Sequence, residues 1–121
     1  LFPESKSFGH TYPAEGFAPY KAFILEFFLT FFLMMVIINV STGSKEIGTM
    51  AAIAVGSVIL LEAMFAGPMT KASMNPVRSI APALFSGHLK DLWLYILAPI
   101  LGSQLAIICH MFMKKSVTEN S

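Results

Sequence analysis

The chain is 121 residues long, 55% hydrophobic and only 12% charged, with a net charge of +1. Soluble domains carry about 25% charged residues, so this composition excludes an ordinary soluble protein and favours a membrane protein. The net charge is too small to suggest a nucleic-acid partner. The single cysteine, Cys109, excludes a disulfide framework and a cysteine metal cluster within the chain.

The first ten residues, LFPESKSFGH, are polar and aromatic and lack the short apolar core of a signal peptide. The sequence also does not begin with methionine. We therefore expect it to start inside a longer protein.

Three apolar stretches are long enough to cross a membrane. They are residues 22–40, with Glu26 as the only charge, residues 49–67, with Glu62, and residues 92–113, which carry no formal charge. A spanning helix needs roughly 17–25 apolar residues, so all three qualify. The alternative, buried helices of a soluble protein, would leave a chain of this size without a polar surface.

Two kinds of residue indicate how these stretches are placed. Small residues four positions apart let helix backbones approach closely in lipid, and they form two stripes: Gly48, Ala52 and Gly56, and Ala98, Gly102 and Ala106. Aromatic side chains favour the headgroup region, and four of them lie near expected span ends: Tyr20, Phe23, Trp93 and Tyr95. We expect the stripes to be helix interfaces and the aromatic residues to lie near the membrane surface.

Residues 67–86, GPMTKASMNPVRSIAPALFS, lie between the second and third apolar stretches and contain the signals of a helix start. Asparagine is a preferred N-cap and proline is favoured at the first helical position, so Asn75 and Pro76 predict a helix that begins there. The chain can then form about ten residues of helix, roughly 15 Å long, before Ser86 and Gly87 end it. That length is half a bilayer, and a second proline in its middle removes one internal hydrogen bond.

Arg78 is the anomaly of this stretch. A cation in the first helical turn is unfavourable, because a helix N-terminus already carries about half a positive charge. A broken local rule without an evident gain is typical of functional sites, and a positive helix end with an arginine would repel cations and protons from a pore. The alternative is an ordinary solvent-facing loop with a short surface helix. Local physics alone leaves both interpretations open.

The sequence MNPVRSIAPAL, preceded by GPMTKAS and followed by a span that begins near a tryptophan, resembles the second signature of the aquaporin and aquaglyceroporin channels, the major intrinsic proteins. LEFFLTFFLMMVIINVSTG resembles the fourth span of that family, the next stretch the fifth, and DLWLYILAPILGSQLA the sixth. FAGPMTKASMNPVRS is most similar to the nodulin-26-like and bacterial glyceroporin-like branches.

The resemblance implies an all-α membrane protein in which residues 1–121 form the C-terminal half of a six-span inverted-repeat fold. Three transmembrane helices would be joined by a re-entrant loop and half-helix over about residues 68–86. The resemblance also implies a passive channel for water and small uncharged solutes such as glycerol, urea or metalloid acids, located in the plasma membrane or inner cell membrane. No cofactor or metal is implied.

Individual roles follow from the match to the family motif. The pore motif would be Asn75, Pro76 and Val77, and Arg78, Ala63 and Ala72 would form the selectivity constriction. Asn75 would cap its own helix and leave its amide N–H groups free to donate to the permeant. Water-strict members of the family place a large polar residue, usually histidine, where this chain has Ala63, so the small residue predicts a pore that also admits solutes.

Three titratable residues in the spans allow more than one interpretation. Glu26 lies about one and a half turns into the first span, where a charge is costly and usually functional or partnered. It could relay protons, but we expect it to accept backbone N–H groups of the re-entrant loop and hold the loop in place. Glu62 could do either. We expect His110 to be an interface residue rather than a gate.

The chain departs from its relatives at two positions. Val77 stands where most members of the family have alanine, which makes the contact in the middle of the membrane bulkier. Lys71 replaces a small residue near the outer mouth, where it could bias entry electrostatically or simply be solvated.

The partners implied are water and small neutral solutes, the lipid bilayer, and the N-terminal half of the same channel, which would complete the pore; the family resemblance implies a homotetramer. One alternative is a strictly water-selective channel. Another is a three-span protein that forms the pore as an antiparallel dimer, an inverted repeat made from separate subunits. An intramembrane enzyme is disfavoured, because the chain lacks a paired nucleophile and base, metal-ligand spacing and a Gly-rich phosphate loop.

Overall fold

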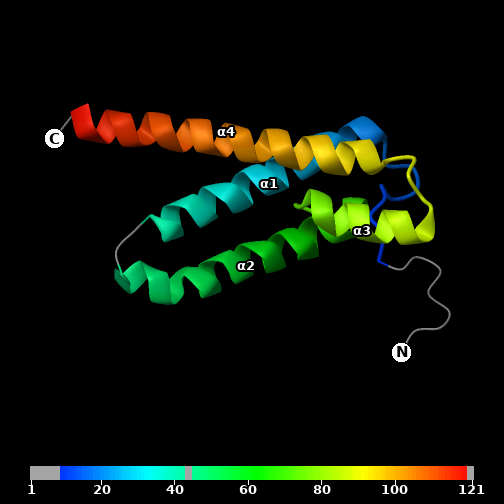
Figure 1. Ribbon diagram of the computed structural model, residues 1–121, viewed down its shortest axis with the longest axis horizontal. Helices are drawn as coiled ribbons and strands as arrows, with labels where there is room; N and C mark the ends of the chain where they lie inside the picture. The colour runs from blue at the N-terminus through cyan, green and yellow to red at the C-terminus, as the bar shows by residue number, and fades with distance from the viewer. Residues whose placement is uncertain (1–8, 43–44, 120–121) are drawn as a thin grey trace.

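The computed structural model describes residues 9–42 and 45–119, and in this part of the chain every regular element is a helix. The four helices are α1 (Pro19–Ser41), α2 (Lys45–Thr70), α3 (Pro76–Ser86) and α4 (Leu92–Glu119) (Figure 1). Three of them contain segments that are long and apolar enough to cross a membrane: Pro19–Ser41, Met50–Thr70 and Leu92–Val117. The fold class is therefore all-α with three candidate spans, as expected.

The long helices extend beyond the apolar stretches seen in the sequence. Helical hydrogen bonds do not depend on hydrophobicity, so α4 continues past residue 113 into a polar segment that ends at Glu119. The second helix also runs further than residue 67 and includes Pro68 in its final turn before it ends at Thr70. As a result, the non-helical segment between α2 and α3 is only residues 71–75.

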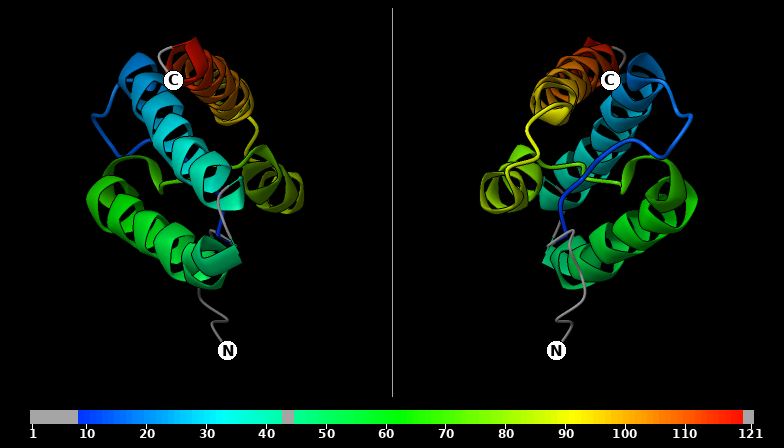
Figure 2. Two further views of the ribbon diagram at one scale, coloured as in Figure 1. Left: turned by 90° about the vertical axis from the view of Figure 1, so that its left-hand side faces the viewer. Right: turned by 90° about the vertical axis from the view of Figure 1, so that its right-hand side faces the viewer.

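The long helix α1 is at the centre of the packing, because it contacts both α4 and α2 (Figures 1 and 2). The short helix α3 contacts α4. Figure 1 shows that α3 begins part-way along the bundle and runs back to the end where α4 begins. Its C-terminus is capped by Gly87, whose φ of 73° lies in the left-handed region and whose N–H donates to the Ala83 carbonyl.

The close approach of α1 and α4 depends on the second stripe of small residues. Ala98, Gly102 and Ala106 are all buried. A Cβ atom at Gly102 would overlap the backbone carbonyl of Phe27 and lie 3.2 Å from the backbone nitrogen of Phe31. This stripe is therefore the expected helix interface.

The first stripe behaves differently at Ala52 and Gly56, while the surroundings of Gly48 lie outside the described part of the structure. Ala52 and Gly56 are exposed, and a Cβ atom added at Gly56 would meet no described atom within 4 Å. Among the described residues, this side of α2 is therefore not a packed interface.

We expect Gly102→Ala to lower the free energy of unfolding by about 1–3 kcal/mol, because the added methyl group meets rigid backbone rather than a flexible side chain. Thermal unfolding in detergent micelles, followed by circular dichroism, measures the change. The matched control is Gly56→Ala, which adds the same methyl group into open space and should not destabilise the protein. Equal melting temperatures for Gly102→Ala and the parent protein would contradict this account of the interface.

The aromatic residues near the expected span ends differ in their burial. Tyr20 and Trp93 are exposed, 62% and 49% respectively, as residues of the membrane surface would be, but Tyr95 is fully buried. Its hydroxyl donates to the Thr70 carbonyl over 2.8 Å. Tyr95 lies near the start of α4, as the sequence indicated, and the polar end of α2 provides a buried partner for its hydroxyl.

Candidate functional site

The start of α3 has the geometry expected for a capped helix. Asn75 is extended, with φ −152° and ψ 121°, and its Oδ1 accepts the Val77 backbone N–H over 2.9 Å. Pro76 occupies the first helical position, where its missing N–H leaves no donor unsatisfied. The Asn75 side-chain amide donates to no other described residue, so its N–H groups are available to a ligand.

The loop before this cap has an unfavourable backbone. Three non-glycine residues have positive φ: Lys71 at 68°, Ala72 at 43° and Met74 at 55°. Left-handed conformations cost an L-residue about 1–2 kcal/mol each. Such conformations persist only when the surrounding structure determines them.

The carboxylate of Glu26 is one of the groups that hold the loop in this conformation. This side chain is completely buried, and it accepts the Ser73 N–H at Oε1 and the Met74 N–H at Oε2, both over 2.9 Å. Oε1 also accepts the Thr70 hydroxyl over 2.7 Å. The two backbone N–H groups of the loop are the contacts expected of Glu26 from the sequence, and the Thr70 hydroxyl adds a contact from the end of α2.

The end of α2 is tied to the loop and to α4 through Thr70. Its hydroxyl accepts the Ala72 N–H over 3.3 Å, and its carbonyl accepts the buried Tyr95 hydroxyl. Contacts from α1, α4 and the loop itself thus converge on this residue.

A chain of hydroxyl groups holds the loop from its other side. The Thr11 hydroxyl donates to Ser79 over 2.7 Å, the Ser79 and Ser73 hydroxyls lie 2.5 Å apart, and Ser73 donates to the Asn75 carbonyl over 2.9 Å. Each hydroxyl has one proton. Since the Ser73 proton is donated to the Asn75 carbonyl, Ser79 donates to Ser73, and the four residues form one directed chain.

We expect Ser79→Ala to destabilise the protein by about 1–3 kcal/mol, because it leaves the buried Thr11 hydroxyl without an acceptor and removes the donor to Ser73. Chemical unfolding in mixed micelles measures the loss. The control is Ser57→Ala, which removes an exposed hydroxyl from α2 and should change little. A Ser79→Ala protein as stable as the parent would show that the hydroxyl chain contributes nothing to stability.

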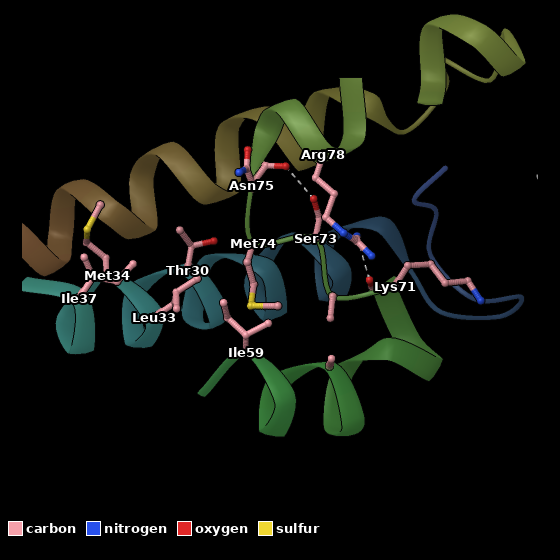
Figure 3. Close-up of a pocket in the computed structure, with 12 residues that line it drawn as sticks. Thr30, Leu33, Met34, Ile37, Ile59, Lys71, Ser73, Met74, Asn75 and Arg78 are labelled. Carbon is pink, nitrogen blue, oxygen red and sulfur yellow. Dashed lines mark hydrogen bonds between the residues drawn. The ribbon is translucent and has the colours of Figure 1, made fainter. Parts of the chain in front are cut away.

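The loop, the cap and two long helices line an open cavity of about 390 Å³ (Figure 3). Helix α1 contributes Thr30 and an apolar wall, α2 contributes Ile59 and Ala63, and the loop and α3 contribute the polar side. The complete lining is Thr30, Leu33, Met34, Ile37, Ile59, Ala63, Lys71, Ala72, Ser73, Met74, Asn75 and Arg78. One wall can therefore contact carbon, while the other presents hydrogen-bond donors.

The cavity brings together most of the site residues predicted from the sequence. Asn75, Arg78, Ala63 and Ala72 all line it, although Ala63 comes from a different helix. Arg78 is exposed, and its Nη1 donates to the Lys71 carbonyl over 3.2 Å, as Figure 3 shows. This bond links the first turn of α3 to the first residue of the loop.

Other predicted residues lie outside the cavity lining. Pro76 shapes the start of α3, and Val77 is 68% exposed. Glu26 does not line the cavity but holds the loop that does. His110 lines a separate cavity near the C-terminal ends of α1 and α4, together with Asn39.

Glu62 also points away from the site, although it is adjacent to Ala63 in the sequence. It is buried in an apolar groove between α1 and α2, formed by Leu25, Phe28, Leu29, Phe32, Leu61 and Phe65. Its Oε2 has no hydrogen-bond partner among the described residues.

Several residues of the site were missed from the sequence: Thr70, Ser73, Met74, Ser79 and Tyr95. The available signal was the clustering of hydroxyl residues around the Asn75-Pro76 pair, since polar groups buried in a membrane need partners. That signal does not say which hydroxyl bonds to which group. The left-handed backbone of Met74 had no signal in the sequence, because the residue is not glycine.

Comparison with known proteins identifies the family. Residues 3–110 match the family described as Major intrinsic protein. The chain belongs to the major intrinsic protein family.

Several plant proteins are similar in sequence to this major intrinsic protein. Nodulin-26 of Glycine max is 48% identical over 83 residues, which are 69% of this chain and 31% of the relative. Aquaporin NIP6-1 of Arabidopsis thaliana is 40% identical over 114 residues, covering 94% of this chain and 37% of the relative. Aquaporin NIP3-1 of the same species is 47% identical over 93 residues, covering 77% and 28%. The chain thus spans about a third of the length of these relatives.

Membership explains the composition of the chain. Major intrinsic proteins are multi-pass membrane proteins, and the described residues of this member include three helices long and apolar enough to span a membrane. The expected likeness to the nodulin-26 branch is confirmed by the names of these relatives.

Proposed function

We propose that this chain forms part of the wall of a passive transmembrane channel for water and small uncharged solutes the size of glycerol, urea or an undissociated metalloid acid. The observation that carries the proposal is the cavity in which Asn75 and Arg78 face an apolar wall from α1. A polyol presents hydroxyl groups on one side and carbon on the other, so it can satisfy both walls at once.

Asn75 acts as the donor in this scheme. Its Oδ1 is held by the Val77 N–H, which orients the side-chain amide so that Nδ2 can donate to a solute oxygen. A permeant that accepts a fixed hydrogen bond here cannot relay a proton along a continuous file. Pro76 and Val77 complete the pore motif by fixing the start of the half-helix and its exposed tip.

Arg78, Ala63 and Ala72 form the narrow part of the pore in this proposal. The Arg78 guanidinium and the positive N-terminal end of α3 repel cations and protons. Ala63 and Ala72 contribute only methyl groups, which leaves room for a three-carbon solute. The re-entrant loop of residues 71–75 is supported by Glu26 and does not itself conduct.

We also infer that a second, complementary half-channel completes the pore, either upstream in the same polypeptide or in another subunit. In support, α3 is apolar on surfaces that no described residue covers, with Val77, Leu84 and Phe85 exposed by 68%, 67% and 87%. The complete channel assembles as a homotetramer in this proposal, by analogy with its family.

Stopped-flow light scattering on vesicles that contain the complete channel tests the function. We expect the protein to accelerate both osmotic water flow and glycerol entry over empty vesicles, without raising proton conductance. Water flux without glycerol flux would instead identify a strictly water-selective channel and overturn the proposed solute class.

A further inference from the structure

A second cavity adjoins the first and shares Arg78 and Lys71 with it. It has a volume of about 320 Å³ and is lined by Gly9, His10, Tyr12, Gly67, Lys71 and Arg78. Two of these six residues carry a full positive charge, and none of the described residues that line the cavity is an aspartate or a glutamate. The proposed conduction does not account for Lys71.

Both cations are held at this cavity by neutral groups. The Arg78 guanidinium donates to the Lys71 carbonyl over 3.2 Å, and the Lys71 ammonium lies 5.0 Å from the centroid of the Tyr12 ring. Neither side chain forms an ion pair with any carboxylate in residues 9–42 and 45–119. Two positive charges thus face one cavity without compensation from the part of the chain that the structure describes.

The helix start adds to this excess of positive charge. Arg78 lies in the first turn of α3, where the helix dipole contributes about half a positive charge. An anion in the cavity would offset all three contributions and would remove the electrostatic conflict of an arginine at a helix N-terminus. The guanidinium has five N–H donors in a planar fork that matches two oxygens of an oxyanion, and among the described residues only its Nη1 forms a hydrogen bond.

We propose that this cavity binds a small oxyanion, such as inorganic phosphate, between the guanidinium of Arg78 and the ammonium of Lys71. Arg78 provides paired hydrogen bonds, and Lys71, positioned over Tyr12, provides the second charge. The proposal concerns binding alone, so it holds or fails independently of whether the channel conducts glycerol.

Isothermal titration of inorganic phosphate into the complete protein in maltoside micelles tests the site, with chloride used to keep the ionic strength constant. We expect saturable binding to the parent protein and an affinity about tenfold lower for Lys71→Asn, which loses a charge-assisted hydrogen bond. Asparagine is chosen because it tolerates the left-handed backbone at this position better than most residues. The charge-conserving Lys71→Arg variant should retain binding.

The matched control is Lys90→Gln. Lys90 is exposed and lines a neighbouring cavity with His10 and Tyr12, but it does not line this one. Its replacement should leave the phosphate affinity unchanged. The proposal is overturned if phosphate gives no saturable heat, if Lys71→Asn binds it as tightly as the parent protein, or if Lys90→Gln weakens binding as much as Lys71→Asn does.

Discussion

Replacing Ala63 with histidine is expected to reduce glycerol flux by at least about tenfold while water flux falls far less. The imidazole would enter the cavity of about 390 Å³ opposite Asn75 and Arg78, where Ala63 contributes only a methyl group. A barrier increase of about 1.4 kcal/mol is enough for a tenfold change in rate, and steric exclusion of a three-carbon solute should exceed it. Stopped-flow measurements on the same vesicles give both rates.

Ala63→Ser provides the control for this experiment. It adds a polar atom at the same position with almost no increase in volume, so glycerol flux should stay close to that of the parent protein. If histidine and serine reduced glycerol flux equally, polarity rather than size would control selectivity at this position. If neither changed the flux, Ala63 would not form part of the constriction.

Replacing Glu26 with glutamine is expected to destabilise the protein by about 2–5 kcal/mol and to abolish glycerol flux. Glutamine can keep one oxygen on Thr70 and Ser73, but it would place an amide N–H group against the Met74 N–H, which now donates over 2.9 Å to Oε2. Two donors would then face each other in a fully buried site. Without the carboxylate, the left-handed conformations of the loop lose their support.

Hydrogen exchange measures the local loss of loop structure in Glu26→Gln, and thermal unfolding measures the loss of overall stability. The Met74 amide should exchange much faster in Glu26→Gln, and the melting temperature should fall. Glu15→Gln is the control, because Glu15 is exposed on the segment before α1; substitutions at such positions usually change stability by less than about 0.5 kcal/mol. A Glu26→Gln protein with parental stability and flux would show that the loop is held by other contacts.

Much of the fold could be predicted from local sequence. The spans were visible because a helix long enough to cross lipid needs an uninterrupted apolar stretch, and three such stretches are present. The half-helix was visible because Asn75, Pro76 and Gly87 provide start and stop signals within the helix itself. These features depend on residues within a few positions of one another.

The exact ends of the long helices were less predictable. Hydropathy marks where lipid contact ends, whereas a helix ends where its hydrogen bonds can no longer be continued or capped. Pro68 was therefore expected in the loop but lies in the last turn of α2. The burial of Tyr95 was not predicted for a related reason, since its partner on α2 cannot be recognised from its own neighbours in the sequence.

By itself, the sequence determined the family, the apolar helices and the capped half-helix with its arginine, because each is encoded by a short continuous pattern. Only the tertiary structure decided which groups hold the loop of residues 71–75 and which carboxylate supports it. Glu26 reaches Thr70, Ser73 and Met74 across 44 to 48 residues of chain, and Glu62, equally apolar in its surroundings along the sequence, turns instead into a groove between α1 and α2. The difference arises from how these helices pack, because a buried carboxylate is positioned by the donors that folding brings to it.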